Sequence, residues 1–176
     1  MVKGLQMGAP ELRHRLLELD RAVAALHPDR DFYLVLADRG ALLLMGRLSR
    51  ATEDMDALKC SPELVALMER YDINNRIQGA YGDHFPYNWE DRLVPLDVET
   101  AAIKCYAASL EDIVASKLCS DRSDDEFDVR RAEIIAAIDW NLLEMVSHEM
   151  ERSQLNPRRH KNFLYNYETY RGECGP

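Results

Sequence analysis

The 176-residue sequence predicts an α/β (α+β) fold, with strands and helices mixed over about residues 1–110 and helices alone over about residues 110–176. Two observations lead to this prediction. In the first part, short apolar runs typical of buried strands alternate with patterns of helical period. After Ser109, apolar residues recur at helical spacing. No linker, internal repeat or low-complexity segment interrupts the sequence, so we expect one domain over residues 1–176.

The first part opens with an apolar stripe at helical spacing, formed by Leu12, Leu16, Leu19, Val23 and Leu26. Pro10 suits the first turn of this helix, and His27-Pro28 ends it. The apolar run Phe32–Leu36 then predicts a buried strand. Ala41–Met45 is apolar on all sides and short, which fits either a buried helical turn or a second strand segment.

Further along the first part, Met55 alternates with Asp54 and Asp56, which predicts a strand that shows both carboxylates on one face. Ser61-Pro62 opens a helix that runs to about Tyr71. The remaining elements are a loop or irregular hairpin over 74–89 and two strand candidates, 92–98 and 101–106.

The second part begins at Ser109, whose hydroxyl is expected to cap a helix through Leu118. Helical apolar spacing returns at Val129, Ala132, Ile135, Ala136 and Ile138. Asp139 is expected to cap a further helix, which Asn156-Pro157 ends. The basic and aromatic tail from Arg158 to Tyr170 predicts a terminal helix that docks its rings on the core, and the alternative is binding to an RNA backbone.

Composition excludes several classes of protein. With 22 basic and 31 acidic residues the net charge is −9. This charge argues against a protein whose whole surface binds nucleic acid. No apolar run approaches the roughly 20 residues of a membrane span, and the first residues lack the apolar segment of a secretory signal. The four cysteines and five histidines show no zinc-like spacing, so we expect reduced thiols and a cytoplasmic protein.

Asp54-Met55-Asp56 is the strongest candidate for chemistry. Two carboxylates at alternate positions of a strand project side by side, and hard cations such as Mg²⁺ prefer oxygen ligands of this kind. The alternative is a chance triplet, because Asp29-Arg30-Asp31 has the same form in an expected turn.

The segment around this triplet resembles a known family. A strand, a glycine, a short apolar helix and then Arg-x-Thr-x-Asp-x-Asp occur between Leu34 and Asp56. This order resembles the nucleotidyltransferase superfamily, and most closely the small bacterial branch related to the AbiEii-like toxins of type IV toxin–antitoxin systems. The matching residues are Ala41, Leu42, Gly46, Arg50, Thr52, Asp54 and Asp56.

A second block strengthens the resemblance. The branch carries a helix of the form Glu-Asp-Leu-x-x-x-Lys-Leu-x-x-x-Arg-x-x-Asp-x-x-Asp. Residues 111–128 fit this pattern, with Ile113 in the position of the first Leu. The two blocks together span more than half of the sequence.

The resemblance implies a small mixed sheet flanked by helices and an activity that transfers a nucleoside monophosphate from an NTP to an RNA or protein hydroxyl. It implies that Asp54 and Asp56 hold Mg²⁺ and that Asp125 or Asp128 acts as a further acid or as the base. The residues implied to contact the nucleotide or its phosphates are Arg39, Gly40, Arg50, Thr52, Lys117 and Arg122. The implied partners are an acceptor such as tRNA or a protein, and a cognate antitoxin, in a toxin–antitoxin or phage-defence setting.

One departure from the family pattern supports a rival interpretation. Asp38 and Arg39 stand where the family has a glycine pair, and Gly40 follows. Side chains there would crowd the path of the phosphates, although Arg39 would offer a cation. The rival is a nucleotidyltransferase fold without catalysis that acts as a protein-interaction module. For Lys117 and Asp128, the alternative is a solvated helix face with local ion pairs.

Overall fold

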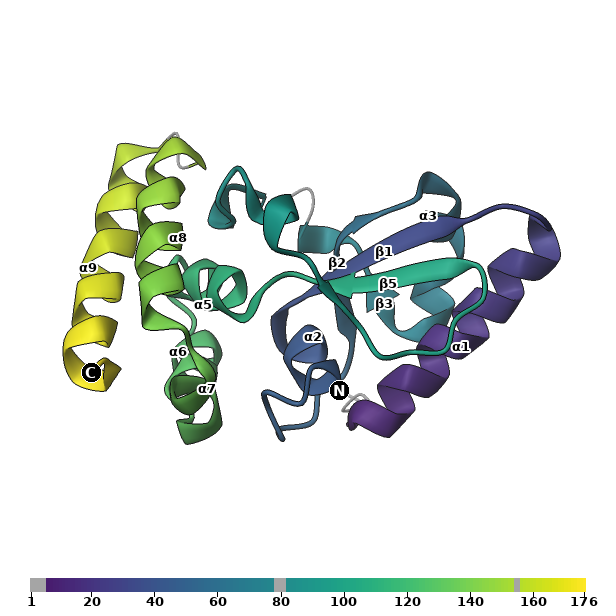
Figure 1. Ribbon diagram of the computed structural model, residues 1–176, viewed down its shortest axis with the longest axis horizontal. Helices are drawn as coiled ribbons and strands as arrows, with labels where there is room; N and C mark the ends of the chain where they lie inside the picture. Colours follow the sequence, from purple (N-terminus) through teal and green to yellow (C-terminus); the bar gives the residue numbers. More distant parts are fainter. Residues whose placement is uncertain (1–5, 78–81, 154–155) are drawn as a thin grey trace. The chain divides into compact units, whose positions relative to one another are not determined.

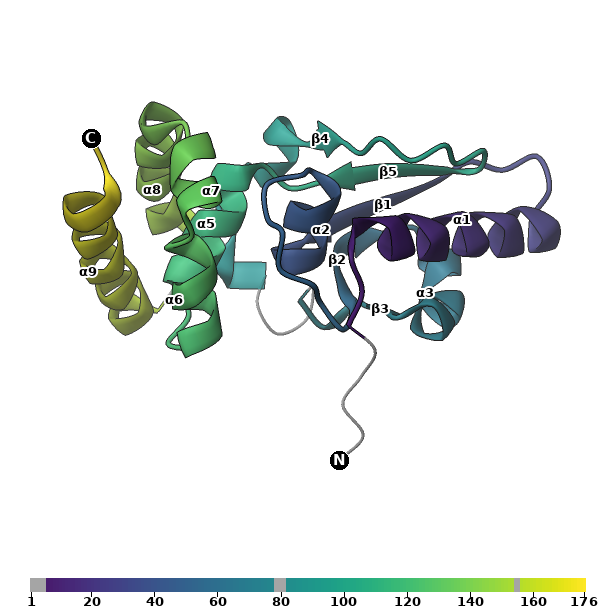
Figure 2. The same ribbon diagram turned by 90° about the horizontal axis from the view of Figure 1, so that it is seen from below.

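The computed structural model describes residues 6–77, 82–153 and 156–176 (Figures 1 and 2). The chain divides into two compact units. Unit 1 consists of Met1–Ala80 and Leu93–Ala108, and unit 2 consists of Tyr81–Arg92 and Ser109–Pro176. Unit 1 holds a mixed sheet with helices, and unit 2 is helical, which confirms the predicted α/β class with a helical C-terminal half.

The sheet of unit 1 has five strands among the described residues, in the order β3-β2-β1-β5-β4. Their bounds are β1 (Phe32–Ala37), β2 (Met55–Cys60), β3 (Ile73–Asn74), β4 (Val94–Pro95) and β5 (Ile103–Ala107). The central strand β1 pairs antiparallel with β2 and parallel with β5. Its apolar sequence explains this place, because a central strand needs side chains that tolerate burial.

Among the described residues, unit 1 contains the helices α1 (Ala9–Leu26), α2 (Asp38–Leu44) and α3 (Pro62–Met68), the last followed by a 3₁₀ turn over Glu69–Tyr71. The predicted stripe on α1 is confirmed, since Leu12, Leu16, Leu19 and Val23 are all buried. The segment that fitted either a helical turn or a strand is the helix α2, which is buried from Gly40 to Leu44. Figure 2 shows α1 and α2 on the same face of the sheet, where they contact each other.

Asp20 fastens α1 to the sheet. Its carboxylate is buried and accepts three backbone hydrogen bonds, from Ala101, Ala102 and Ile103 at 2.9, 2.9 and 2.8 Å. These amides lie at the start of β5, where an unpaired N–H would be costly to bury. A single acidic side chain thus joins the first helix to the last strand of the sheet.

Unit 2 contains α5 (Leu110–Leu118), α6 (Ser123–Val129), α7 (Ala132–Ala137), α8 (Trp140–Ser153) and α9 (Pro157–Cys174), with 3₁₀ turns at Gly82–His84 and Trp89–Arg92. The two predicted caps are confirmed. The Ser109 hydroxyl accepts from the Asp112 amide at 3.1 Å, and the Asp139 carboxylate accepts from the amides of Asn141 and Leu142.

The last helix, α9, docks on its own unit as predicted. Phe163, Tyr167 and Tyr170 are buried, and the rings of Tyr170 and Trp140 lie 5.6 Å apart. Tyr165 differs from them, because 71% of its surface is exposed.

Two sequence predictions need correction. The strand expected over 92–98 is only Val94–Pro95, because Trp89–Arg92 forms a 3₁₀ turn before it. The helical pattern from Val129 to Ile138 is divided between α6 and α7, because Arg131 has extended backbone angles between them. Part of the loop expected over 74–89, residues 78–81, lies outside the described residues.

The junction of β1 and α2 has an unusual backbone. Asp38 has a φ of 59°, in the left-handed region that favours glycine. Two residues later, a Cβ on Gly40 would lie 3.0 Å from Met55 Cγ and 3.4 Å from the Asp54 carbonyl oxygen. Glycine at position 40 therefore lets α2 pack directly against the start of β2.

No helix among the described residues combines the length and the apolar character that crossing a membrane requires.

Replacing Asp20 with alanine tests how α1 is held. Three backbone donors would lose a charged acceptor, so we expect the free energy of unfolding to fall by about 3 kcal/mol in urea denaturation. Asp31→Ala is the control, because its exposed carboxylate pairs with Lys104 at 3.5 Å and should contribute less than about 0.5 kcal/mol. A loss at Asp20 as small as that of the control would contradict the assignment.

Comparing Asp38→Gly with Asp38→Ala tests the backbone at the start of α2. Both variants remove the carboxylate, so their difference reports the cost of the left-handed conformation. We expect the glycine variant to be more stable by about 1 kcal/mol in urea denaturation. Equal stability of the two variants would show that position 38 is not held in this conformation in solution.

Candidate functional site

Asp54 and Asp56 lie at the start of β2, Asp54 directly before the strand and Asp56 as its second residue. Met55 between them is fully buried, and both aspartates are half-buried. This alternation agrees with the strand predicted from the sequence. In the sheet, Asp56 pairs with Ala37 of β1 on one side and with Asn74 of β3 on the other.

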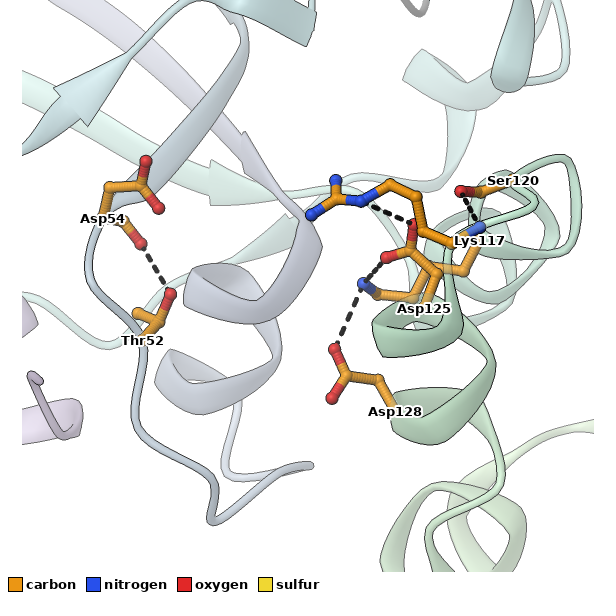
Figure 3. A network of polar contacts seen from close by, with 7 residues as sticks. Thr52, Asp54, Lys117, Ser120, Asp125 and Asp128 are labelled. Atoms are coloured by element: carbon orange, nitrogen blue, oxygen red, sulfur yellow. Dashed lines mark hydrogen bonds and ion pairs between the residues drawn. The ribbon is translucent and has the colours of Figure 1, made fainter. Parts of the chain in front are cut away.

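Thr52 shapes the turn that leads to Asp54. Its hydroxyl donates to the Asp54 carbonyl oxygen at 3.1 Å (Figure 3). Its backbone N–H and carbonyl pair with those of Met7, and its side chain is buried. The threonine of the Arg-x-Thr-x-Asp-x-Asp motif thus holds the backbone that presents Asp54.

Asn74 is a site residue that sequence reasoning missed. Its amide nitrogen donates to Asp54 Oδ2 at 3.0 Å, and its amide oxygen accepts from the Arg76 backbone N–H at 3.1 Å. These two bonds set which end of the amide faces the carboxylate. No spacing in the sequence points to Asn74, because only the pairing of β3 with β2 brings it beside Asp54.

The surroundings of Asp54 disfavour its ionised form. Burial raises the pKa of its carboxyl above the ordinary value, and the nearby carboxylates of Asp38 and Glu53 add to this effect. The Asn74 hydrogen bond and the Arg76 guanidinium oppose it without cancelling it. Carboxylates that repel one another in a half-buried place are stabilised by a bound cation, and their oxygen donors suit Mg²⁺.

The other predicted residues of unit 1 lie on α2 and in the loop before β2. Arg39 and Gly40 are in the first turn of α2, and Arg50 precedes the turn at Thr52. Arg39 and Arg50 are half-buried, whereas Gly40 is buried against Met55. Gly40 therefore supports the backbone contact between α2 and β2.

Lys117, Asp125 and Asp128 form a buried ion cluster in unit 2. The Lys117 ammonium on α5 lies 2.8 Å from Asp125 Oδ1 and 3.3 Å from Asp128 Oδ2, both on α6 (Figure 3). The Lys117 and Asp128 side chains are 4% and 0% exposed. The alternative of a solvated helix face for these two residues is therefore wrong, although they do form local ion pairs.

The charge balance around Asp125 favours its ionised carboxylate. Burial raises the pKa of the Asp125 carboxyl, but the Lys117 ammonium and hydrogen bonds from Lys117 and Ser120 outweigh it, so the pKa is lower than usual. Arg122 also contributes, with its Nε 3.9 Å from Asp125 Oδ2. Unlike Lys117, the Arg122 side chain is 67% exposed.

The acidic pair that opens the second motif has a structural role. Asp112 is fully buried and accepts two hydrogen bonds from the Arg92 guanidinium, at 3.1 and 2.7 Å, and one from the Ser109 hydroxyl at 2.7 Å. Glu111 accepts from the Asp139 backbone N–H at 2.9 Å, and its burial raises the pKa of its carboxyl. These bonds fix the first turn of α5 and thereby the position of Lys117 one and a half turns later.

The candidate residues thus gather in two places, one in each unit. Unit 1 contains Arg39, Gly40, Arg50, Thr52, Asp54 and Asp56, and unit 2 contains Lys117, Arg122, Asp125 and Asp128.

Comparison with known proteins agrees with the motifs. A family model described as "Nucleotidyltransferase of unknown function (DUF6036)" matches residues 14–174, which include every candidate residue in both units. No curated protein and no solved structure matched the sequence. Since the match covers most of the chain, this protein belongs to that nucleotidyltransferase family.

Proposed function

We propose that this protein transfers a nucleoside monophosphate from an NTP to a hydroxyl group of RNA or of a protein, with Mg²⁺ as its cofactor. The observation that carries the proposal is the pair of half-buried carboxylates, Asp54 and Asp56, at the start of β2 in a member of a nucleotidyltransferase family. Membership of the family also supports an NTP as the substrate.

In this proposal Asp54 and Asp56 bind the metal ion through their carboxylate oxygens. Bound Mg²⁺ would neutralise the triphosphate and polarise the phosphorus–oxygen bonds. Asn74 holds the Asp54 carboxylate in one orientation through its 3.0 Å hydrogen bond. Arg39 on α2 and Arg50 in the loop before β2 supply positive charge for phosphate oxygens.

Unit 2 would supply the acid–base group. As the resemblance implies, Asp125 or Asp128 would accept the proton of the acceptor hydroxyl, and the cluster holds these two carboxylates beside one ammonium. Lys117 compensates these buried carboxylates. Arg122 is better suited to contact phosphate, because most of its side chain is exposed.

The acceptor and the setting extend the resemblance to AbiEii-like proteins. We propose tRNA or a protein as the acceptor, a cognate antitoxin as a further partner, and a role in a toxin–antitoxin system or phage defence in the bacterial cytoplasm. The motifs over residues 34–56 and 111–128 support this branch.

A second candidate function is a protein-interaction module without catalysis. The observation that favours it is Asp38, which has a left-handed backbone and places a carboxylate near Asp54 where the related family has glycine. A negative charge there would oppose a triphosphate unless a metal ion compensates it.

Replacing the two aspartates separates the candidates. We expect Asp54→Asn and Asp56→Asn each to weaken Mn²⁺ binding, measured by calorimetry, and to lower transfer of label from α-³²P NTPs to total tRNA and cell protein by about 100-fold or more. Asp31→Asn, an exposed aspartate of the same unit, is the control and should retain both properties. Metal binding without any label transfer by the wild type would favour the interaction module, and equal label in all variants would refute the proposal.

Asn74→Ala tests the hydrogen bond to Asp54. Outer-shell partners of this kind change metal affinity by about 10-fold, so we expect Mn²⁺ binding to weaken by that factor. Asn88→Ala is a control, because it removes a side-chain amide that bonds to Arg92 in unit 2, away from Asp54. The urea stability of both variants should fall by only about 1 kcal/mol. Unchanged Mn²⁺ affinity in Asn74→Ala would show that the bond is not needed for binding.

A further inference from the structure

Unit 2 contains a cavity of about 300 Å³, lined by Lys117 and Arg122 and by residues of α9 to which no role is assigned above. Its walls come from the end of α5, the turn that follows it, α6 and α9. The polar and aromatic residues that matter for recognition are Lys117, Ser120, Arg122, Arg130, Tyr165 and Asn166. A cavity of this size is at the lower end of the range for small-molecule sites, roughly 300–1,000 Å³.

Two tyrosines of α9, Tyr165 and Tyr170, line the cavity, and Tyr165 is the one whose ring is exposed. Its neighbours on α9, Phe163, Tyr167 and Tyr170, are packed in the core, and Tyr170 donates a hydrogen bond to the Val129 carbonyl at 2.7 Å. Tyr165 is instead 71% exposed. An exposed ring on an otherwise docked helix contributes little to folding and is well suited to stack on a planar ligand.

The polar groups of the cavity are held in place. The Asn166 amide nitrogen donates to the Leu118 carbonyl at 2.9 Å, which fixes its side chain beside the cavity. The Ser120 hydroxyl accepts from the Arg122 backbone N–H at 3.2 Å and fixes the turn between α5 and α6. Fixed amide and hydroxyl groups next to an aromatic wall can read the edge of a heterocycle.

The charged residues that line the cavity indicate which class of ligand it can bind. The lining includes three basic residues, Lys117, Arg122 and Arg130, and two acidic ones, Asp121 and Glu126, whereas the chain as a whole has a charge of −9. Lys117 and Arg130 form short ion pairs with carboxylates, whereas Arg122 lies 3.9 Å from Asp125 Oδ2 and is 67% exposed, so its guanidinium is the group best able to bind a phosphate. The two acids disfavour a bare anion but can accept hydrogen bonds from the amino groups of a base.

We propose that this cavity binds one nucleotide, with its base stacked on Tyr165, the edge of the base facing Asn166, and its phosphate on Arg122. A free nucleotide and the terminal nucleotide of a single-stranded RNA share this chemistry. The proposal goes beyond catalysis at Asp54 and Asp56, because a cavity in unit 2 can bind a nucleotide whether or not transfer occurs.

The test uses the full chain in EDTA, so that no divalent cation assists binding. One arm titrates the four nucleoside monophosphates and the other titrates single-stranded RNA trinucleotides. Binding is followed by calorimetry and by the NMR signal of the Asn166 side-chain amide. The expected result is a shift of that signal, and affinity that falls about tenfold in Tyr165→Ala and is retained in Tyr165→Phe. Tighter binding in the first arm identifies a free nucleotide, and tighter binding in the second identifies an RNA end.

Arg122→Gln should weaken binding of a nucleoside monophosphate about fivefold and leave binding of the unphosphorylated nucleoside unchanged. Tyr87→Ala is the matched control, since Tyr87 is 55% exposed in the same unit and packs against Arg152, and it should bind like the wild type.

The inference is overturned if no nucleotide or trinucleotide shifts the Asn166 signal, or if Tyr165→Ala binds as tightly as the wild type. Nucleotide binding that is lost in Asp54→Asn and kept in Tyr165→Ala would refute binding in the cavity, but it would leave the proposed transferase activity unaffected. Binding that depends on Tyr165 in a protein that transfers no label would support the cavity and count against the transferase.

Discussion

The position of β2 between β1 and β3 is the constraint on which the candidate metal site depends. Burial of Met55 fixes the register, because a slip of one residue would bury Asp54 and Asp56 and expose the methionine. The same register brings Asn74 beside Asp54, and the close approach of Gly40 keeps α2 against the first residue of the strand. The carboxylates are therefore held by backbone pairing, and their half-buried position follows from it.

The carboxylates near Asp54 and the Lys117–Asp125–Asp128 cluster differ in how their negative charge is compensated. Around Asp54, the neighbouring carboxylates and burial all raise the pKa, and the Asn74 hydrogen bond and Arg76 compensate only in part. Such a place gains most from a divalent cation. In unit 2, the Lys117 ammonium already contacts both carboxylates, which lowers the pKa of Asp125. The first cluster thus fits a metal site, and the second fits a preformed acid–base and structural group.

Some residues of the second motif hold the start of α5 in place, and others are the candidate functional residues. Glu111 and Asp112 hold the start of α5 through Asp139, Ser109 and Arg92, while Lys117, Arg122 and Asp125 lie at the other end of the motif. A motif defined by spacing alone does not separate these roles, because its charged members on α5 and α6 look alike in the sequence. Their partners separate them, since Glu111 and Asp112 bond to groups that fix the start of α5, whereas Lys117 pairs with Asp125 and Asp128 and the Arg122 side chain is mostly exposed.

The sequence by itself determined the α/β class, most helices with their caps, the central strands and the two motifs, because each depends on residues close together in the chain. It did not predict Asn74 beside Asp54 or Arg92 on Asp112, each pair 20 residues apart, nor Asp20 on Ile103, 83 residues apart. It also left open whether residues 41–45 form a helix and whether Lys117 faces solvent. Only the tertiary structure decided these contacts. Strand pairing and burial bring together segments that are far apart in the sequence, and the local pattern of one segment does not specify its partner.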